Sequence, residues 1–164
     1  MITEQEQAKI RLLSDTELYR QAVDFMRGIA KPIPQKQTNG LLNVSLANTY
    51  DQLQKFVARQ RDRETWPPTE RHIRIFYREL GQKLKRMDDL YVSSIMKART
   101  KPAPQEDIQT LRMLLAREFI QHVLAENAYM GAIRAFQNVD LDNSRNQGRP
   151  QGNNRAPVTR QGRT

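Results

Sequence analysis

The sequence of 164 residues contains no cysteine, which excludes disulfide bonds, thiolate zinc sites and a cysteine nucleophile. It also lacks any apolar run near the ~18 residues that a membrane-spanning helix requires. Its first residues, MITEQEQAKIRLL, are acidic and polar, whereas a signal peptide is basic and then apolar. These absences predict a soluble, cytoplasmic protein that has no membrane partner.

Motifs that carry catalysis are scarce as well. There are two histidines, His72 and His122, and neither a glycine-rich phosphate loop nor a G-x-S-x-G nucleophile motif is present. Alternating runs of valine and isoleucine are also missing, so we expect no strands. The sequence therefore predicts an all-α protein that is not an enzyme and that takes neither a cofactor nor a metal.

Positive charge is what the sequence has in excess. The formal net charge is +9, which favours anionic partners. Residues 143–164 hold five arginines and no acidic residue, among many asparagines, glycines and glutamines. Such a composition cannot bury enough apolar surface to offset the entropy of ordering. We therefore predict a helical domain over residues 1–142 and a disordered basic tail over residues 143–164.

Prolines divide the predicted domain. Each of three close pairs should end one helix and allow another to begin. The pairs are Pro32 and Pro34, Pro67 and Pro68, and Pro102 and Pro104. The segments between them, 1–31, 35–66, 69–101 and 105–142, all show apolar residues at helical spacing. Because their connections are short, we expect an antiparallel bundle of four main helices plus a short N-terminal helix.

Helix-start patterns refine these segments. Residues 14–17 read SDTE, a capping-box pattern that predicts a new helix after a short helix over residues 3–13. In the second segment, Asn48 or Thr49 is placed to restart the helix. In the third, Thr69 follows two prolines and is the expected N-cap.

Basic residues concentrate on the third segment, whose net charge is +5, and at the end of the second. A shared face of this kind is typical of contact with nucleic-acid phosphates. Trp66 and Tyr77 lie nearby as candidate stacking groups, although a tryptophan beside two prolines also suits a structural role. Alternatively, this basic face is only a solvated helix surface, or it docks another protein. The candidate binding residues are Lys55, Arg59, Arg61, Arg63, Arg71, Arg74, Arg78 and Lys85.

Arg117 and His122 form an R-x4-H pattern on the fourth predicted helix. It is similar to the pattern of the all-helical HEPN ribonucleases, in which a histidine and an arginine act on RNA across a dimer. The alternative is that His122 sits at the edge of the core and is held by Glu118 or Glu126. These three residues also form a column along one helix, but the Glu-x-x-His motif of metal-binding bundles is missing.

Four stretches support a family resemblance: LLNV (41–44), LQKFVARQRDR (53–63), IFYREL (75–80) and FIQH (119–122). With them the chain resembles the small helical subunits of type III CRISPR effector complexes. The resemblance implies a non-catalytic subunit that contacts the backbone of the guide RNA and the target strand, beside other subunits and further copies of itself. A HEPN-like ribonuclease and a helical protein-interaction adaptor remain the alternatives. The contacts that the resemblance implies are Arg59, Arg61, Arg63, Arg71, Arg74, Arg78 and Lys85.

Overall fold

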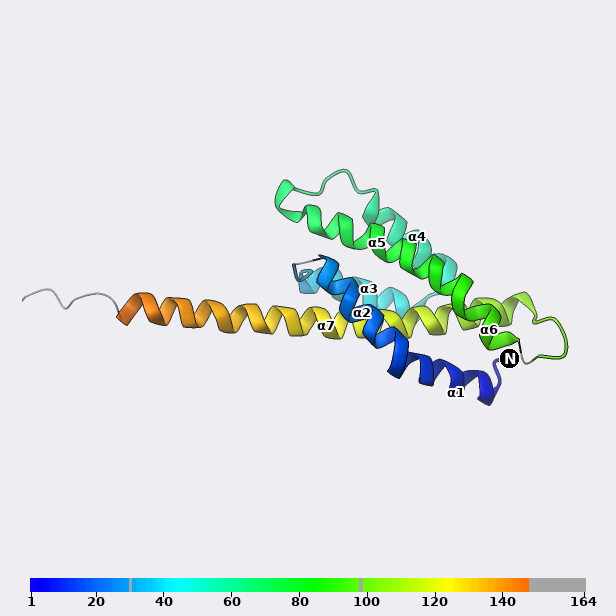
Figure 1. The fold of residues 1–164 in the computed structure, drawn as a ribbon. Helices are drawn as coiled ribbons and strands as arrows, with labels where there is room; N and C mark the ends of the chain where they lie inside the picture. Colours follow the sequence, from blue (N-terminus) through cyan, green and yellow to red (C-terminus); the bar gives the residue numbers. More distant parts are fainter. Residues whose placement is uncertain (30, 98, 148–164) are drawn as a thin grey trace, which may run out of the picture. The chain divides into compact units, whose positions relative to one another are not determined.

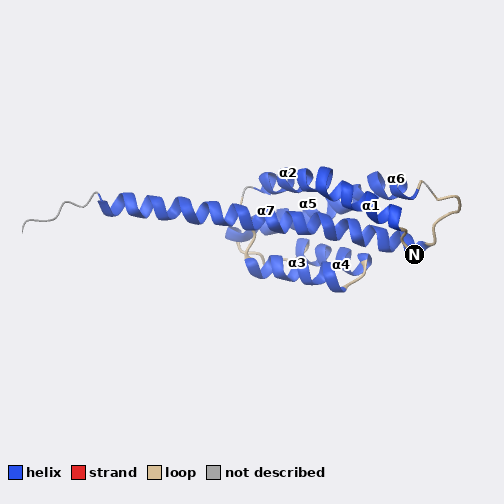
Figure 2. Cartoon of the chain, turned by 90° about the horizontal axis from the view of Figure 1, so that it is seen from below, coloured by secondary structure: helices blue, strands red, loops and turns tan. Residues whose placement is uncertain are grey.

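Helices make up the regular structure of the described chain (Figure 1, Figure 2). The computed structural model describes residues 1–29, 31–97 and 99–147, with side chains up to residue 139. No strand occurs within those ranges, so the predicted all-α class is confirmed there. The chain divides after Gly131 into two compact units, and each is described by itself.

The first segment is continuously helical from Glu4 to Ile29. Helix α1 (Glu4–Leu13) continues through a π-helical stretch, η1 (Ser14–Leu18), into α2 (Tyr19–Ile29). The short N-terminal helix is confirmed, but the predicted helix start at Ser14 is wrong. Ser14 has helical dihedral angles, φ −57° and ψ −51°, and its hydroxyl donates to Glu118 instead of capping an amide. The Ser14 hydroxyl therefore bonds to Glu118, a residue distant in the sequence, and not to the backbone amide that the capping-box pattern predicts.

The second segment contains two helices, α3 (Gln35–Ala47) and α4 (Tyr50–Arg61). Thr49 caps α4 with a complete capping box, which confirms the predicted restart. The amide of Thr49 donates to Gln52 Oε1 at 2.9 Å, and the amide of Gln52 donates to Thr49 Oγ1 at 3.4 Å. The chain reverses direction at this cap, so that α4 turns back from α3 (Figure 1).

The third segment begins with a 3-10 turn, η2 (Pro68–Glu70), followed by α5 (Arg71–Met87). Thr69 lies inside that turn, so its predicted role as the N-cap is wrong. After the two prolines the backbone forms a 3-10 turn, which is tighter than an α-helical turn, before α5 begins. After α5 comes a second π-helical stretch, η3 (Asp88–Val92), and then α6 (Ser93–Met96).

The last helix, α7 (Gln105–Gln147), continues to Gln147, five residues past the predicted boundary of the basic tail. The rest of that predicted tail, residues 148–164, lies outside the described residues. In the first unit α7 supplies buried residues to the core. In the second unit its side chains Ile133, Phe136 and Val139 are exposed. The buried residues are Leu111, Met113, Leu115, Ala116, Phe119, Ile120 and Val123.

Aromatic rings join three helices at the centre of the first unit. Phe25 of α2 meets Phe76 of α5 at 5.5 Å between ring centres, and it meets Phe119 of α7 at 5.8 Å. Both contacts are edge-to-face, the geometry that aromatic rings prefer. Phe76 also meets Tyr77 edge-on at 5.2 Å. Since Phe76 and Tyr77 are buried, this cluster fixes which face of α5 is left for solvent.

Candidate nucleic-acid interface

Helices α4 and α5 pack along each other and leave a groove between them with a volume of about 470 Å³. The helices approach closely at Gly81, where an added Cβ would lie 3.4 Å from Val57 Cγ1. The Tyr50 hydroxyl donates to the Leu84 carbonyl at 3.3 Å and links the same two helices. These two contacts hold α4 and α5 together and so define the walls of the groove.

Four of the eight predicted binding residues line this groove: Lys55 and Arg61 from α4, and Arg78 and Lys85 from α5. All four are exposed. In the part of the chain that the structure describes, no acidic residue lines the groove. Because its walls carry one sign of charge, the groove should concentrate anions from solution.

Both arginines of the groove also have acidic sequence neighbours. Arg61 donates from Nε and Nη2 to the two carboxylate oxygens of Asp62, each at 2.6 Å. These hydrogen bonds lower the pKa of the Asp62 carboxyl. Arg78 donates from Nε and Nη2 to Glu79 Oε1 at 3.1 and 3.0 Å. The acidic partners orient both guanidinium groups and reduce the net charge beside the groove.

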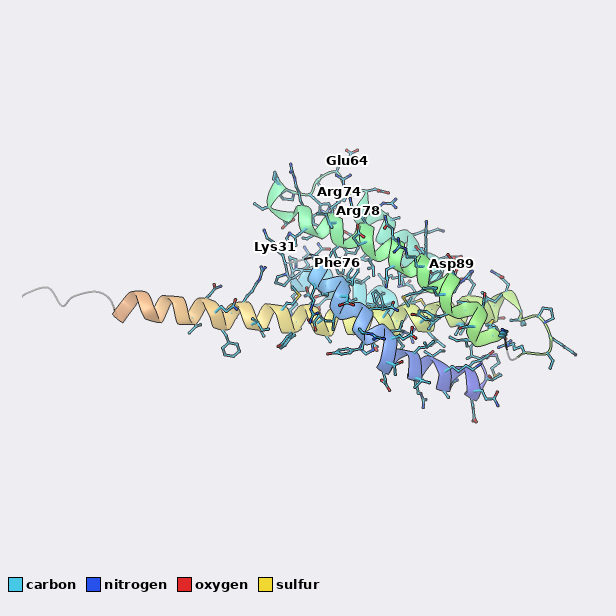
Figure 3. All side chains as sticks on the ribbon, in the orientation of Figure 1. Lys31, Glu64, Arg74, Phe76, Arg78 and Asp89 are labelled. Atoms are coloured by element: carbon cyan, nitrogen blue, oxygen red, sulfur yellow. The ribbon has the colours of Figure 1, made fainter. Side chains whose placement is uncertain are left out.

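Arg74 has a structural contact at the end of the groove. Its Nε donates to the carbonyl oxygen of Arg61 at 3.2 Å, in the last turn of α4. A cationic donor is favourable at that position because helix carbonyls there lack helical partners. Arg74 and Arg78 lie on the side of α5 next to α4, while Phe76 lies on the side toward α2 (Figure 3). Arg74 therefore ties α5 to α4 in addition to carrying charge.

The two predicted stacking residues have structural roles. Tyr77 is fully buried, and its hydroxyl donates to Gln37 Oε1 at 3.3 Å, so the prediction that it stacks on a base is wrong. Burial raises the pKa of its hydroxyl well above the usual range. Trp66 packs against the core and donates from Nε1 to the Gln60 carbonyl at 2.8 Å. The guanidinium of Arg63 lies 4.9 Å from the centre of the Trp66 ring, a cation–π contact.

The remaining predicted residues lie outside the α4–α5 groove. Arg59 lines a second groove between α3 and α4, of about 600 Å³, to which Lys55 also contributes. Arg71 is exposed in the first turn of α5 and lines neither groove. The predicted eight-residue face thus divides into one basic groove and a surrounding set of cations.

The sequence did not predict a half-buried polar cluster around Ser14. Ser14 Oγ lies 2.7 Å from Glu118 Oε2 and 2.8 Å from His122 Nε2. The hydroxyl has one proton, which it donates to the carboxylate, so His122 Nε2 must donate its own proton to Ser14 Oγ. In this arrangement the histidine does not act as a base toward the serine. The Tyr19 ring meets His122 edge-on at 5.6 Å.

Arg117 points to a different neighbour. Its Nε donates to the Ser45 carbonyl at 3.2 Å, and its Nη2 lies 3.4 Å from the Leu46 carbonyl, in the last turn of α3. Within one chain, Arg117 and His122 thus contact α3 and η1 respectively and do not meet each other. The described residues also contain no group of three histidine or carboxylate side chains placed to hold a metal ion.

The fold and the groove together define an all-α protein with a basic inter-helical groove. No family model, no curated protein and no solved structure matches the chain. Among the helices of the described residues, none combines the length and the apolar character needed to cross a membrane.

Proposed function

We propose that the chain is a non-catalytic RNA-binding protein that holds the phosphate backbone in the groove between α4 and α5. The observation that carries the proposal is that Lys55, Arg61, Arg78 and Lys85 converge on one groove whose described lining contains no acidic residue. Two helices contribute two cations each, so the charge is presented to a linear polyanion from both sides.

The binding is electrostatic in this mechanism. Each phosphate that a cation neutralises releases condensed counterions, which lowers log K by about 0.7 per tenfold rise in salt for a single strand. Four groove cations that each engage one phosphate would give a slope of about −3. Affinity should therefore fall steeply between low and physiological salt.

The assembly in which this activity operates is a further part of the proposal. The resemblance to small subunits of type III CRISPR effector complexes supports a guide-RNA complex with other subunits and copies of the same chain. This part rests on the resemblance alone. Purification of the chain together with its bound RNA, followed by sequencing of that RNA, tests it directly, because a guide complex should yield one defined class of RNA and not a random sample of cellular RNA.

The groove itself is tested by charge reversal. The double variant Arg78→Glu/Lys85→Glu should lose at least tenfold in affinity for a labelled RNA oligonucleotide, measured by fluorescence anisotropy at fixed salt. The matched control is Arg27→Glu/Lys36→Glu, which makes the same change in net charge at exposed positions on α2 and α3.

Circular dichroism should show unchanged helix content in both variants. Equal affinity of the groove variant and the control would reject the groove as the RNA site. Retention of an acidic protein, with no RNA binding by the wild type, would favour the adaptor alternative instead.

A further inference from the structure

The lining of the α4–α5 groove varies along its length. Contacts of Arg74 with the Arg61 carbonyl and of Tyr50 with the Leu84 carbonyl show that α4 and α5 run in opposite directions. Arg61 and Arg78 therefore lie toward one end of the groove, and Lys55 and Lys85 lie toward the other. Arg78 and Lys85 are seven residues apart on one helix, about 10 Å along its axis. The stretch between the ends is apolar: the partly exposed Ala58 and Gly81 form its accessible floor, above the buried Val57 and Tyr77.

A nucleic-acid duplex exposes no apolar group that could pack on the floor between the cations. A double helix presents phosphates and sugars to such a groove, while its base faces are stacked inside. A single strand differs, because an unstacked base has a flat apolar face and a phosphate on each side of it. The order of cation, apolar floor and cation matches the order of phosphate, base and phosphate.

Glutamine amides stand on both walls of the groove, Gln54 on α4 and Gln82 on α5. Gln54 Nε2 donates to the Tyr50 hydroxyl at 2.8 Å, and that hydroxyl donates onward to the Leu84 carbonyl. The Gln54 amide is therefore held in place by a hydrogen-bonded chain before any ligand arrives. A side-chain amide of this type can pair with the edge of a base through both its donor and its acceptor.

From this arrangement we propose that the groove accepts one unpaired base on its apolar floor, with the flanking phosphates on the cations at its two ends. The ligand class is accordingly single-stranded nucleic acid, and duplexes bind only through the outer charges. The inference rests on the proposed function, because it concerns the same groove, and it adds which part of the nucleotide the groove recognises.

Filling the floor tests this inference without changing charge. Gly81→Leu places a side chain on the floor, and Gly28→Leu is the matched control, because it adds the same side chain at an exposed glycine of α2 that has open space around it. Ala58→Leu fills the floor from α4 and guards against a folding defect in either glycine variant. The probes are a single-stranded RNA of about twelve nucleotides, the same strand with abasic central positions, and the corresponding duplex.

The wild type and Gly28→Leu should prefer the single strand over the abasic strand and over the duplex by about tenfold, as burial of a base face against apolar surface implies. In Gly81→Leu and Ala58→Leu this preference should fall toward unity, while duplex affinity stays the same. A folded floor-filling variant that retains the full preference overturns the inference, as does a wild type that binds all three probes equally.

Charge reversal separates this result from failure of the proposed function. If Arg78→Glu/Lys85→Glu abolishes binding of all three probes while the floor-filling variants bind as the wild type does, phosphate binding stands and base insertion is rejected. If charge reversal leaves binding of every probe intact, both proposals fall.

Discussion

The side-chain amide of Asn127 forms both of its hydrogen bonds with the backbone of one residue, Ile33. Asn127 Oδ1 accepts from the Ile33 amide at 2.6 Å, and Asn127 Nδ2 donates to the Ile33 carbonyl at 3.0 Å. Both residues are buried. The pairing satisfies a backbone amide and carbonyl that have no helical partner between α2 and α3, and it fixes that connection to α7.

Replacing this amide should be costly. We expect Asn127→Ala to lower the free energy of unfolding by about 2–3 kcal/mol, because it leaves a buried backbone donor and acceptor unpaired. Urea denaturation followed by circular dichroism measures the loss. The control Asn39→Ala changes an exposed asparagine on α3 and should leave stability the same or slightly higher, since alanine favours a helix. Equal stability of the two variants would contradict the assigned role.

A second buried contact predicts a pH dependence. Arg99 donates to both carboxylate oxygens of Glu6, at 2.6 and 2.8 Å, and this pairing lowers the pKa of Glu6 to about 2. Since the folded pKa lies below the unfolded value of about 4.5, ionised Glu6 stabilises the fold above that pH. The stabilisation is lost as pH falls from about 4.5 toward 2.

The corresponding experiment compares Glu6→Gln with the wild type across pH. Above pH 5 the variant should be less stable by about 2 kcal/mol, and the difference should shrink steadily between pH 4.5 and pH 2. Chemical denaturation at each pH gives the free energies. Glu4→Gln, an exposed change in the same first turn of α1, should show no such trend. A difference that does not vary with pH would argue against the ion pair.

Freeing the groove arginines should strengthen RNA binding. In Asp62→Asn/Glu79→Gln, the guanidinium groups of Arg61 and Arg78 lose their anionic partners, and two negative charges beside the groove disappear. We expect affinity to rise about two- to fivefold at low salt and the gain to shrink at high salt. Anisotropy titrations at two salt concentrations measure this.

The single variant Asp51→Asn is compared with Asp62→Asn, because it removes the same charge from the first turn of α4. It should change affinity less than Asp62→Asn does. If all these variants bind RNA as the wild type does, the two carboxylates do not compete with phosphate.

The Ser14 cluster is predicted to stabilise the fold and not to catalyse. Ser14→Ala should cost about 1–2 kcal/mol, because the half-buried Glu118 and His122 side chains lose their shared partner. RNA affinity should stay unchanged in Ser14→Ala and in His122→Ala. Purified wild-type protein should leave end-labelled RNA intact on a denaturing gel. RNA cleavage that His122→Ala abolishes, with the fold preserved, would establish the ribonuclease alternative.

Local patterns predicted those features that depend on neighbouring residues in the chain. The Thr49 cap and the proline-separated segments follow from backbone chemistry that acts over a few residues, so the sequence alone shows them. The Ser14 pattern failed for the opposite reason. Its hydroxyl reaches Glu118 on α7, more than one hundred residues away, and no local rule includes that competitor.

The same distinction holds for the groove. Composition and spacing placed the basic residues on the second and third segments and made them solvent-exposed. Only packing of α4 against α5 decided that Lys55, Arg61, Arg78 and Lys85 share a groove, while Arg74 bonds to the backbone of α4. It also decided that Tyr77 faces the core, because the rings of Phe56 and Phe76 meet it there.

By itself, the sequence determined that this protein is helical, where its helices are separated, and that its charge attracts anions, since these follow from propensity, proline chemistry and composition. The tertiary structure decided which cations converge, which polar side chains are buried together and which aromatic rings are hidden. Those outcomes depend on contacts between residues far apart in the chain, where packing and desolvation outweigh local preference.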